Sequence, residues 1–218
     1  MLCIAWAMPA RAQVGGSAAL DSDYRFRGVS LSDSRPSLRL TLNVDGTAGW
    51  YAGASVTRAS LEEDQRYDQL LGYAGFVTRA GPGPQFEFGM SASHFAGDAG
   101  YDYVEPYVGV LGERWSARVY YAPNYFGRHV QTAYAELDAH QLLTDRLRLF
   151  GHAGVIEALG GAQDDARRAR ADIRIGTGLA LRDWDLQIAW VAAQRGGPYP
   201  AVFSGQRSAW VAGIAYAF

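Results

Sequence analysis

Lysine is absent from this chain of 218 residues, and all 20 basic residues are arginine. The acidic residues number 22, so the net charge is −2 and gives no reason to expect a nucleic-acid partner. No stretch approaches the run of about 18 apolar residues that a membrane-spanning helix needs, although 49% of the residues are hydrophobic. A helical membrane protein is therefore excluded. The single cysteine, Cys3, lies in a segment that we expect to be removed.

That segment has the layout of a secretory signal. A short apolar run from Leu2 to Met8 is followed by Pro9 and by an Ala-x-Ala box at Ala10 and Ala12. We therefore expect residues 1–12 to be a signal peptide; the alternative is an ordinary buried N-terminal segment. Residues 13–218 show no break in composition, so we expect them to form one domain.

Twelve segments alternate apolar side chains with polar or small ones, which is the pattern of a strand with two different faces. The clearest is residues 36–47, in which Leu38, Leu40, Leu42 and Val44 share one face. Strands that face hydrocarbon must close on themselves, because lipid cannot satisfy exposed backbone groups. The pattern therefore favours a closed barrel around a polar interior.

The connections between these segments alternate in length. Short turns at one end and long loops at the other are typical of bacterial outer-membrane barrels. We predict an all-β fold: a transmembrane, antiparallel, up-and-down β-barrel of about twelve strands, with short periplasmic turns, longer extracellular loops and both termini on the turn side. The short connections are expected at 46–49, 79–84, 111–114, 142–146 and 182–184, and the long ones at 28–35, 58–66, 96–101, 122–130, 159–170 and 194–206.

Aromatic residues gather at the expected strand ends, where girdles at the two membrane interfaces belong. The last strand alternates large and small residues and ends on Phe218, which resembles the C-terminal signal recognised by the barrel-assembly machinery. One girdle is expected on the turn side, from Trp50, Phe86, Trp115, Trp184, Tyr216 and Phe218. A second is expected near the long loops, from Tyr24, Phe26, Tyr121, Tyr125, Phe126, Tyr199 and Phe203.

The inner faces carry charged side chains, which we expect to line the lumen and to set its selectivity. In the first strand, near residues 16–27, Tyr24 and Phe26 face outward, while the alternating charges face the lumen and Gly28 turns the chain into the first loop. These charges either fix the strand register or form a pore constriction. The predicted lumen residues are Asp21, Asp23, Arg25, Arg27, Arg39, Glu87, Glu105, Arg118, Glu136, Asp138, His140, Arg148 and Arg174. Because unpaired buried charges are costly, we expect Arg39, Arg118, Arg148 and Arg174 to pair with Glu87, Glu105, Glu136 or Asp138.

The run SDYRFRGVSLSDSRPSL, from Ser22 to Leu38, resembles the N-terminal motif of the TorF-type porins, a family of gram-negative proteins catalogued as conserved hypothetical. The likeness is close over the first strand and first loop. It extends as a general pattern over the whole chain, including the strand that begins Trp50-Tyr51-Ala52-Gly53 and the terminal aromatic. The resemblance implies an outer-membrane location and a channel role, and it transfers no catalytic residues.

Enzymatic chemistry finds little support. Barrel lipases and deacylases resemble one another in a His-x-Ser pair, which places base and nucleophile on one strand face. None of the four histidines, His94, His129, His140 and His152, is followed by serine two residues later. A protease-like site would need clustered carboxylates with a histidine, and the loop acids Asp98, Asp102, Asp164 and Asp165 are more simply solvated. We expect no enzyme.

Metal chemistry is also weakly supported, and we expect no cofactor. Glu136, Asp138 and His140 share one strand face and could present three ligands. Side chains spaced about 7 Å apart along a strand rarely converge on one ion. We therefore favour a lumen network of Glu136 and Asp138 with Arg118 or Arg148.

We expect an outer-membrane channel for passive diffusion of small polar or ionic solutes. One alternative is a non-conducting structural or adhesion barrel that binds a partner through its loops, and a less favoured one is an outer-membrane enzyme. Outer-membrane lipid and lipopolysaccharide are the expected surroundings. A basic loop tip with Arg167, Arg168 and Arg170 either contacts lipopolysaccharide phosphates or is simply solvated.

Overall fold

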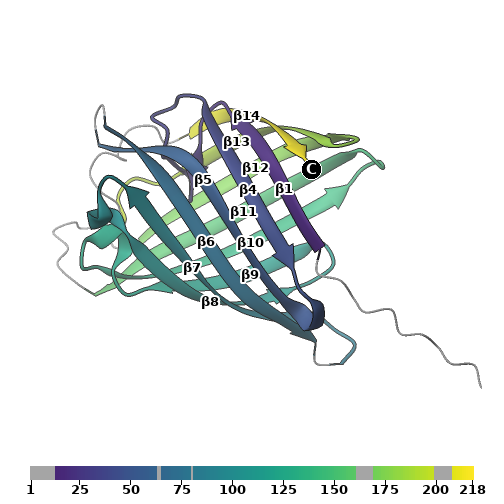
Figure 1. Cartoon of the computed structure of the whole chain (residues 1–218), viewed down its shortest axis with the longest axis horizontal. Helices are drawn as coiled ribbons and strands as arrows, with labels where there is room; N and C mark the ends of the chain where they lie inside the picture. The colour runs from purple at the N-terminus through teal and green to yellow at the C-terminus, as the bar shows by residue number, and fades with distance from the viewer. Residues whose placement is uncertain (1–12, 63–64, 80, 161–168, 199–207) are drawn as a thin grey trace, which may run out of the picture.

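Strands with one apolar and one polar face assemble into a closed sheet (Figure 1). The computed structural model describes residues 13–62, 65–79, 81–160, 169–198 and 208–218. Within these ranges, twelve long antiparallel strands close into one barrel in the order β1-β14-β13-β12-β11-β10-β9-β8-β7-β6-β5-β4, which confirms the predicted all-β fold. The barrel strands are β1 (Gln13–Asp21), β4 (Ser37–Asp45), β5 (Trp50–Glu62), β6 (Gln65–Arg79), β7 (Gln85–Ala96), β8 (Tyr103–Leu111), β9 (Trp115–Ala122), β10 (Gln131–Leu142), β11 (Leu147–Gly160), β12 (Ala169–Leu181), β13 (Trp184–Ala193) and β14 (Ser208–Ala217).

The first and last strands close the sheet. β1 pairs with β14 from Ser17 opposite Ala217 to Asp21 opposite Gly213. The backbones of Gly16 and Phe218 also exchange two hydrogen bonds, of 2.9 and 3.0 Å. A closed sheet has no edge strand with unpaired backbone groups, which is the condition for a sheet to face hydrocarbon.

The two faces of each strand follow the sequence alternation. On β4, Leu38, Leu40 and Leu42 point outward and are 56%, 46% and 58% exposed, whereas Arg39 and Thr41 between them point into the lumen. The same alternation on the other strands gives the barrel an apolar outer face and a polar inner one. None of the helices in the described part of the chain is long and apolar enough to cross a membrane.

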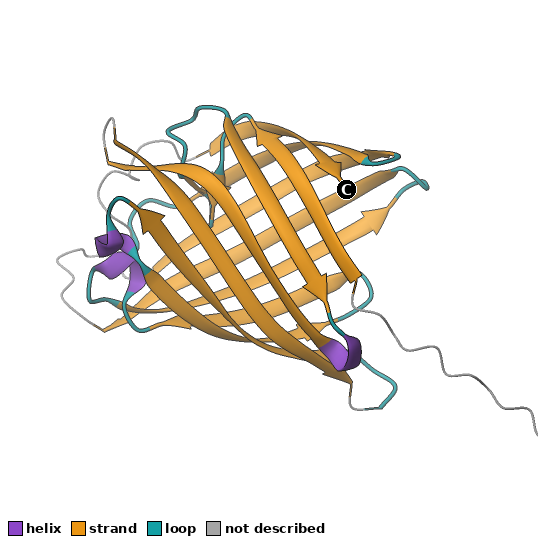
Figure 2. Cartoon of the chain, in the orientation of Figure 1, coloured by secondary structure: helices purple, strands orange, loops and turns teal. Residues whose placement is uncertain are grey.

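Short connections gather at one end of the barrel and longer ones at the other, which we call the short-turn end and the long-loop end. The 3-10 turn η1 (Thr47–Gly49) lies at the short-turn end, and η2 (Ala99–Tyr101) and η3 (Tyr125–Gly127) lie together at the long-loop end (Figure 2). The expected loops at 159–170 and 194–206 lie largely outside the described residues, as does the predicted signal peptide at 1–12.

One expected loop is instead mostly strand. The polar stretch 58–66 was expected to be a long loop, but β5 continues to Glu62 and β6 begins at Gln65. The prediction is wrong because charged side chains pair across the two strands: Arg58 Nε lies 2.9 Å from Asp68 Oδ1. The polar residues here belong to strand ends that are exposed to solvent. They do not interrupt the hydrogen-bonded ladder between the two strands.

Residues 22–36, which we call the inward loop, fold into the barrel and do not continue the first strand. β1 ends at Asp21, and the loop forms a small hairpin of β2 (Arg25–Phe26) and β3 (Val29–Ser30). Tyr24 is 6% exposed and lies in a buried aromatic cluster, against which Phe26 packs. The prediction that these two rings face outward is therefore wrong.

The second aromatic girdle is wrong for the same reason. Tyr125 and Phe126 are buried at the long-loop end, where the Phe126 ring lies 4.9 Å from Tyr103 and 5.8 Å from Phe95. Tyr121 does face outward, at 39% exposure. The inward loop and the connection that holds Tyr125 and Phe126 bend inward, so their rings fill the barrel mouth. The expected Tyr199 and Phe203 lie outside the described residues.

The aromatic residues of the first girdle are exposed at the short-turn end, and Trp115 among them also lines a cavity of the lumen. Tilted ring contacts join Trp184 to Tyr216 and Trp50 to the neighbouring Phe76, both at 4.9 Å. That this ring of side chains marks a membrane interface stays a prediction. The six exposed residues are Trp50, Phe86, Trp115, Trp184, Tyr216 and Phe218.

A charge on the outer face should destabilise the barrel more than the same charge in the lumen. We expect Leu42→Arg to lower the free energy of unfolding by about 2–4 kcal/mol, the cost of arginine near the bilayer midplane. Thr41→Arg, on the inward face of the same strand, should cost less because the lumen is polar. Denaturant titration of the barrel in lipid vesicles measures both, and equal losses would contradict the assignment of faces.

Candidate functional site: the lumen

Two cavities lie in the lumen beneath the inward loop. The first, of about 600 Å³, extends from Gly28 of the loop to Glu113 in a short turn. The second, of about 350 Å³, is lined by Glu87 on the barrel wall. Arg27 and His152 line both cavities. The lumen is thus hollow toward the short-turn end, whereas the inward loop and the aromatic cluster occupy its long-loop end.

An ion pair holds the inward loop against the barrel wall. The two Nη atoms of Arg27 each donate to one carboxylate oxygen of Glu105 on β8, both at 2.8 Å, and Nη1 also donates to the Tyr125 hydroxyl at 3.2 Å. Arg27 is 9% exposed and Glu105 is 2% exposed. A two-pronged arginine–carboxylate pair is a strong and geometrically specific contact. We call this pair the latch.

The surroundings of Arg27 keep it charged. The Tyr134 and Phe26 ring centroids lie 4.1 and 4.7 Å from the guanidinium carbon, which is within the range of cation–π attraction. Burial lowers the pKa of Arg27, but Glu105, Tyr125 and Tyr103 together raise it, so the net pKa lies above its ordinary value. The latch therefore does not open by loss of the arginine proton.

The backbone at the latch adopts an unusual conformation. Arg27 and Gly28, with φ values of +48° and +75°, join β2 to β3, and positive φ at both positions is typical of a type I′ turn. Such turns favour asparagine or glycine first, so arginine here costs backbone energy that its ion pair offsets. A Cβ on Gly28 would lie 2.7 Å from the Asp172 and Ala193 side chains, so only glycine lets the hairpin lie this close to the wall.

One half of the lumen wall is built around Glu87. Its two carboxylate oxygens accept hydrogen bonds from the Tyr51 hydroxyl and from Arg118 Nε, both at 2.6 Å. Arg118 Nη1 also lies 3.8 Å from Glu136, which accepts a hydrogen bond from Tyr120 at 2.9 Å. Two carboxylates therefore share one guanidinium, and this wall carries excess negative charge.

The other half of the wall, on β1, β4 and β12, has the opposite balance. Arg39 lies 3.3 Å from Asp21. Arg174 donates to the side-chain oxygen of Gln187 at 3.1 Å, and no carboxylate of the described residues lies within ion-pair distance of it. Two guanidiniums thus accompany Asp21, whereas Asp172, another inward carboxylate of β12, contacts His152 instead. Opposed charges across a narrow lumen can select solutes by sign and size.

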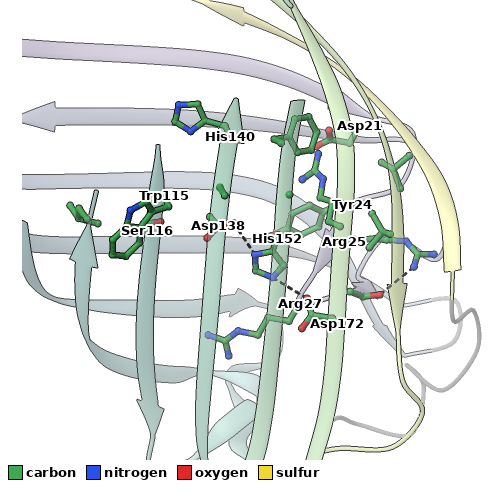
Figure 3. A pocket seen from close by; sticks show the side chains of 18 of the residues that line it. Asp21, Tyr24, Arg25, Arg27, Trp115, Ser116, Asp138, His140, His152 and Asp172 are labelled. Atoms are coloured by element: carbon green, nitrogen blue, oxygen red, sulfur yellow. Dashed lines mark hydrogen bonds and ion pairs between the residues drawn. The ribbon is translucent and has the colours of Figure 1, made fainter. Parts of the chain in front are cut away.

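Neighbouring strands β10, β11 and β12 bring four ionisable side chains together, which we call the histidine cluster: Glu136, Asp138, His152 and Asp172. Figure 3 shows Asp138, His152 and Asp172 side by side. His152 Nδ1 lies 2.8 Å from Asp138 Oδ1, and Nε2 lies 3.0 Å from Asp172 Oδ1. Cross-strand register explains the meeting, because Asp138 lies directly opposite His152. The oxygens of Glu136 and Asp138 and a ring nitrogen of His152 lie within 4.8 Å of one another, so this cluster could hold a metal ion.

The predicted ion pairs are correct for one arginine of the four. Arg118 pairs with Glu87, as expected. The prediction is wrong for the other three: Arg39 pairs with Asp21, Arg148 with Asp185 at 2.5 Å, and Arg174 with neutral Gln187. Glu105 is bound instead by Arg27, and Asp138 by His152. Two of these pairs span an intervening strand: Arg118 and Glu87 both lie opposite Gly109 of β8, and Arg148 of β11 reaches across β12 to Asp185 of β13. Charge alone does not specify such pairings.

Other predicted residues lie inside the barrel in different roles. Asp23 and Arg25 pair with each other at 2.6 Å within the inward loop, so they do not form a ladder with a neighbouring strand. His140 lines the first cavity, but His152 takes the place beside Asp138 that was considered for it. Arg170 lies in β12 and is 4% exposed, so it is not part of a loop tip; Arg167 and Arg168 lie outside the described residues.

The sequence reasoning missed the partners that complete the lumen. Asp172 and Tyr51 were not among the predicted lumen residues, although their inward parity follows from the same alternation. Their roles depend on the strand register, which determines which side chains lie opposite one another on neighbouring strands. To predict these partners, the strand ends would have to be known to within one residue, because a shift of one residue moves every side chain to the opposite face.

Comparisons with known proteins agree with the fold. A model of a family described as bacterial proteins of unknown function (Gcw_chp) matches residues 8–213. No curated protein matches the chain. Among solved structures, the NanC porin has a TM-score of 0.61 at 9% identity and covers 94% of this chain and 99% of its own. The KdgM porin has a TM-score of 0.57 at 13% identity, and the match covers 95% of this chain and 99% of that porin. An outer membrane channel from Pseudomonas putida F1 has a TM-score of 0.52 at 14% identity, and the match covers 97% of this chain and 96% of that channel. Likeness at these identities shows the fold alone, which is that of a porin-like barrel.

Removing one partner of the latch should destabilise the barrel strongly. We expect Glu105→Gln to lower the free energy of unfolding by about 3–5 kcal/mol, because it leaves the buried Arg27 charge uncompensated. The control is Asp33→Asn, which breaks the exposed Arg35–Asp33 pair of the same loop, 3.3 Å long, and should cost under about 1 kcal/mol. Denaturant unfolding in vesicles compares them. Similar small losses from both variants would show that the latch contributes little.

Proposed function

We propose that this chain, which belongs to the Gcw_chp family of bacterial proteins, is an outer-membrane channel for passive diffusion of small polar or ionic solutes. The observation that carries the proposal is the charged, hollow lumen. A cavity of about 600 Å³ runs from the inward loop to a short turn and is lined by Arg39, Asp138 and Arg174.

An outer-membrane location is supported by the outer face. Its large exposed apolar side chains would be unfavourable in water and match the apolar band of outer-membrane barrels. The porin-like fold and the resemblance to TorF-type porins support the same location. With long loops outside, the inward loop lies at the extracellular mouth and the first cavity opens toward the periplasm. Recognition of β14 by the barrel-assembly machinery and contact with lipopolysaccharide belong to this proposal.

The pairing of the lumen arginines favours small solutes of mixed charge. Arg25, Arg27, Arg39, Arg118 and Arg148 each lie within ion-pair distance of a carboxylate, so few guanidinium groups are available to a polyanion. One structure of the KdgM porin is a complex with disordered oligogalacturonate. Because most lumen charge in this chain is already neutralised internally, we propose smaller solutes that fit between the two walls. A transport role is preferred to an enzymatic one since the His-x-Ser pair of barrel lipases and deacylases does not occur in the sequence.

A second candidate function is a non-conducting barrel that binds a partner through its loops. The inward loop favours it, because Tyr24, Phe26 and the latch occupy the extracellular mouth above both cavities. The two functions differ in one property: a channel must let the inward loop move aside. The latch is the contact that resists this movement.

Breaking the latch should therefore increase conduction. We expect the double variant Arg27→Ala/Glu105→Ala, which removes both charges together, to show larger or more frequent current steps in planar bilayers than the parent chain. The matched control, Asp33→Ala/Arg35→Ala, removes the exposed ion pair of the same loop and should leave the currents unchanged. If parent and latch variant were both silent while running as folded barrels on a gel, the non-conducting function would replace the channel.

A further inference from the structure

We propose that the histidine cluster is a binding site for a divalent transition-metal cation of the Zn²⁺ class, held by His152 Nδ1, Asp138 and Glu136 on the lumen wall. Within the described ranges, this is the one group of three such side chains whose donor atoms converge. It lies outside the latch, and although Asp138 lines the cavity of the proposed channel, passive diffusion requires no bound metal ion.

The donor spacing suits a metal ion. His152 Nδ1 and Asp138 Oδ1 are 2.8 Å apart, and donor atoms of all three residues lie within 4.8 Å of one another. With metal–ligand bonds of about 2.0–2.2 Å, neighbouring ligand atoms of a coordinated ion are roughly 3 Å apart. The His152–Asp138 pair therefore already spans one edge of a coordination polyhedron. A small rotation of the Glu136 side chain supplies the third ligand, and the cavities supply water for the rest.

The other ring nitrogen of His152, Nε2, has the kind of hydrogen-bond partners that a metal-bound histidine usually has. Nε2 lies 3.0 Å from the Asp172 carboxylate and 2.9 Å from the Tyr134 hydroxyl. The Asp172 side chain is 3% exposed, so this acceptor is fixed in the wall. A buried carboxylate on the far nitrogen of a histidine fixes the ring and raises the basicity of the near one, which is the usual outer-shell arrangement of a metal-bound imidazole. Tyr120 plays the same part for Glu136, to which it donates at 2.9 Å.

The charge balance also favours a cation. Glu136, Asp138 and Asp172 contribute three carboxylates around one imidazole, and Arg174, opposite His152 on β12, adds one guanidinium. The nearest guanidinium to Glu136, that of Arg118, is 3.8 Å away and already donates to Glu87 at 2.6 Å. A divalent ion would compensate the excess negative charge that this wall carries.

The site is open to ions from the lumen. Asp138 has a 43% exposed side chain and lines the first cavity, which reaches the short-turn end. The ligand set selects the class of ion, because one imidazole with carboxylates suits zinc and similar transition metals. Calcium and magnesium prefer all-oxygen sets, so they should bind weakly.

The test is titration of Zn²⁺ into the full chain, folded in detergent and stripped of metal with a chelator, followed by calorimetry. We expect saturable binding of one ion per chain, and Co²⁺ in its place should give visible absorption bands that imidazole ligation shifts. His152→Ala and Asp138→Asn should abolish saturable binding. Asp172→Asn should weaken it by about 10–100-fold, as loss of an outer-shell partner does.

Two other histidines provide matched controls. His94 forms an exposed pair with Asp102 at 2.7 Å on the outer side of β7, and His140 lies in the same lumen on the same strand as Asp138. His94→Ala and His140→Ala should leave Zn²⁺ binding unchanged. The proposal is overturned if the folded parent chain shows no saturable binding, or if these controls lose as much as His152→Ala.

If His152→Ala does not fold, Glu136→Gln provides a second test of the site. This variant should fold, because glutamine retains a hydrogen-bond acceptor for Tyr120. It should still weaken Zn²⁺ binding, and unchanged affinity in both Glu136→Gln and Asp138→Asn would sink the proposal. The binding test is independent of conduction. Should the barrel also conduct, Zn²⁺ should shift its reversal potential toward anions in the parent and not in Asp138→Asn.

Discussion

The pairing of β1 with β14 is the contact on which every side chain's role depends. A sheet surrounded by hydrocarbon must leave no backbone group unpaired, and closure between Ser17–Asp21 and Gly213–Ala217 achieves this. Once the sheet is closed, each residue is either outside or inside according to its parity along the strand. Leu40 is then committed to the outer surface and Arg39 to the lumen, with no intermediate position. The charges of Arg39, Arg118 and Arg148 lie on the lumen side of their strands as a consequence.

Charges confined to a narrow lumen must be neutralised by their neighbours. Arg118 with Glu87, Arg148 with Asp185 and Arg39 with Asp21 do so along the walls. Glu105 lies deep near the long-loop end, and its counter-charge comes from the inward loop through Arg27. The loop thus folds inward for two reasons that act together: its aromatic rings find an apolar cluster, and its arginine compensates a buried carboxylate.

The sequence predicted the parts of the structure that depend on parity. Alternation of Leu38, Leu40 and Leu42 with polar residues was enough to establish strands, faces and closure. It did not reveal that Tyr24 and Phe26 leave the first strand, because the alternation of SDYRFRG also fits a continuing strand. A type I′ turn at Arg27-Gly28 carries no recognisable signal, since arginine is an unusual first residue there. Likewise, His152 and Asp138 are fourteen positions apart in sequence, and register alone brings them together.

The latch and the histidine cluster are physically joined, so the state of one acts on the other. The Tyr134 ring lies 4.1 Å from the Arg27 guanidinium, while its hydroxyl contacts His152 and Asp172. Gly28 packs so closely against Asp172 that no side chain fits between them. A cation at the cluster would repel Arg27 and weaken its hold, whereas the uncompensated carboxylates attract it. Such coupling is reciprocal: whatever displaces the inward loop must also change the affinity of the cluster for positive charge.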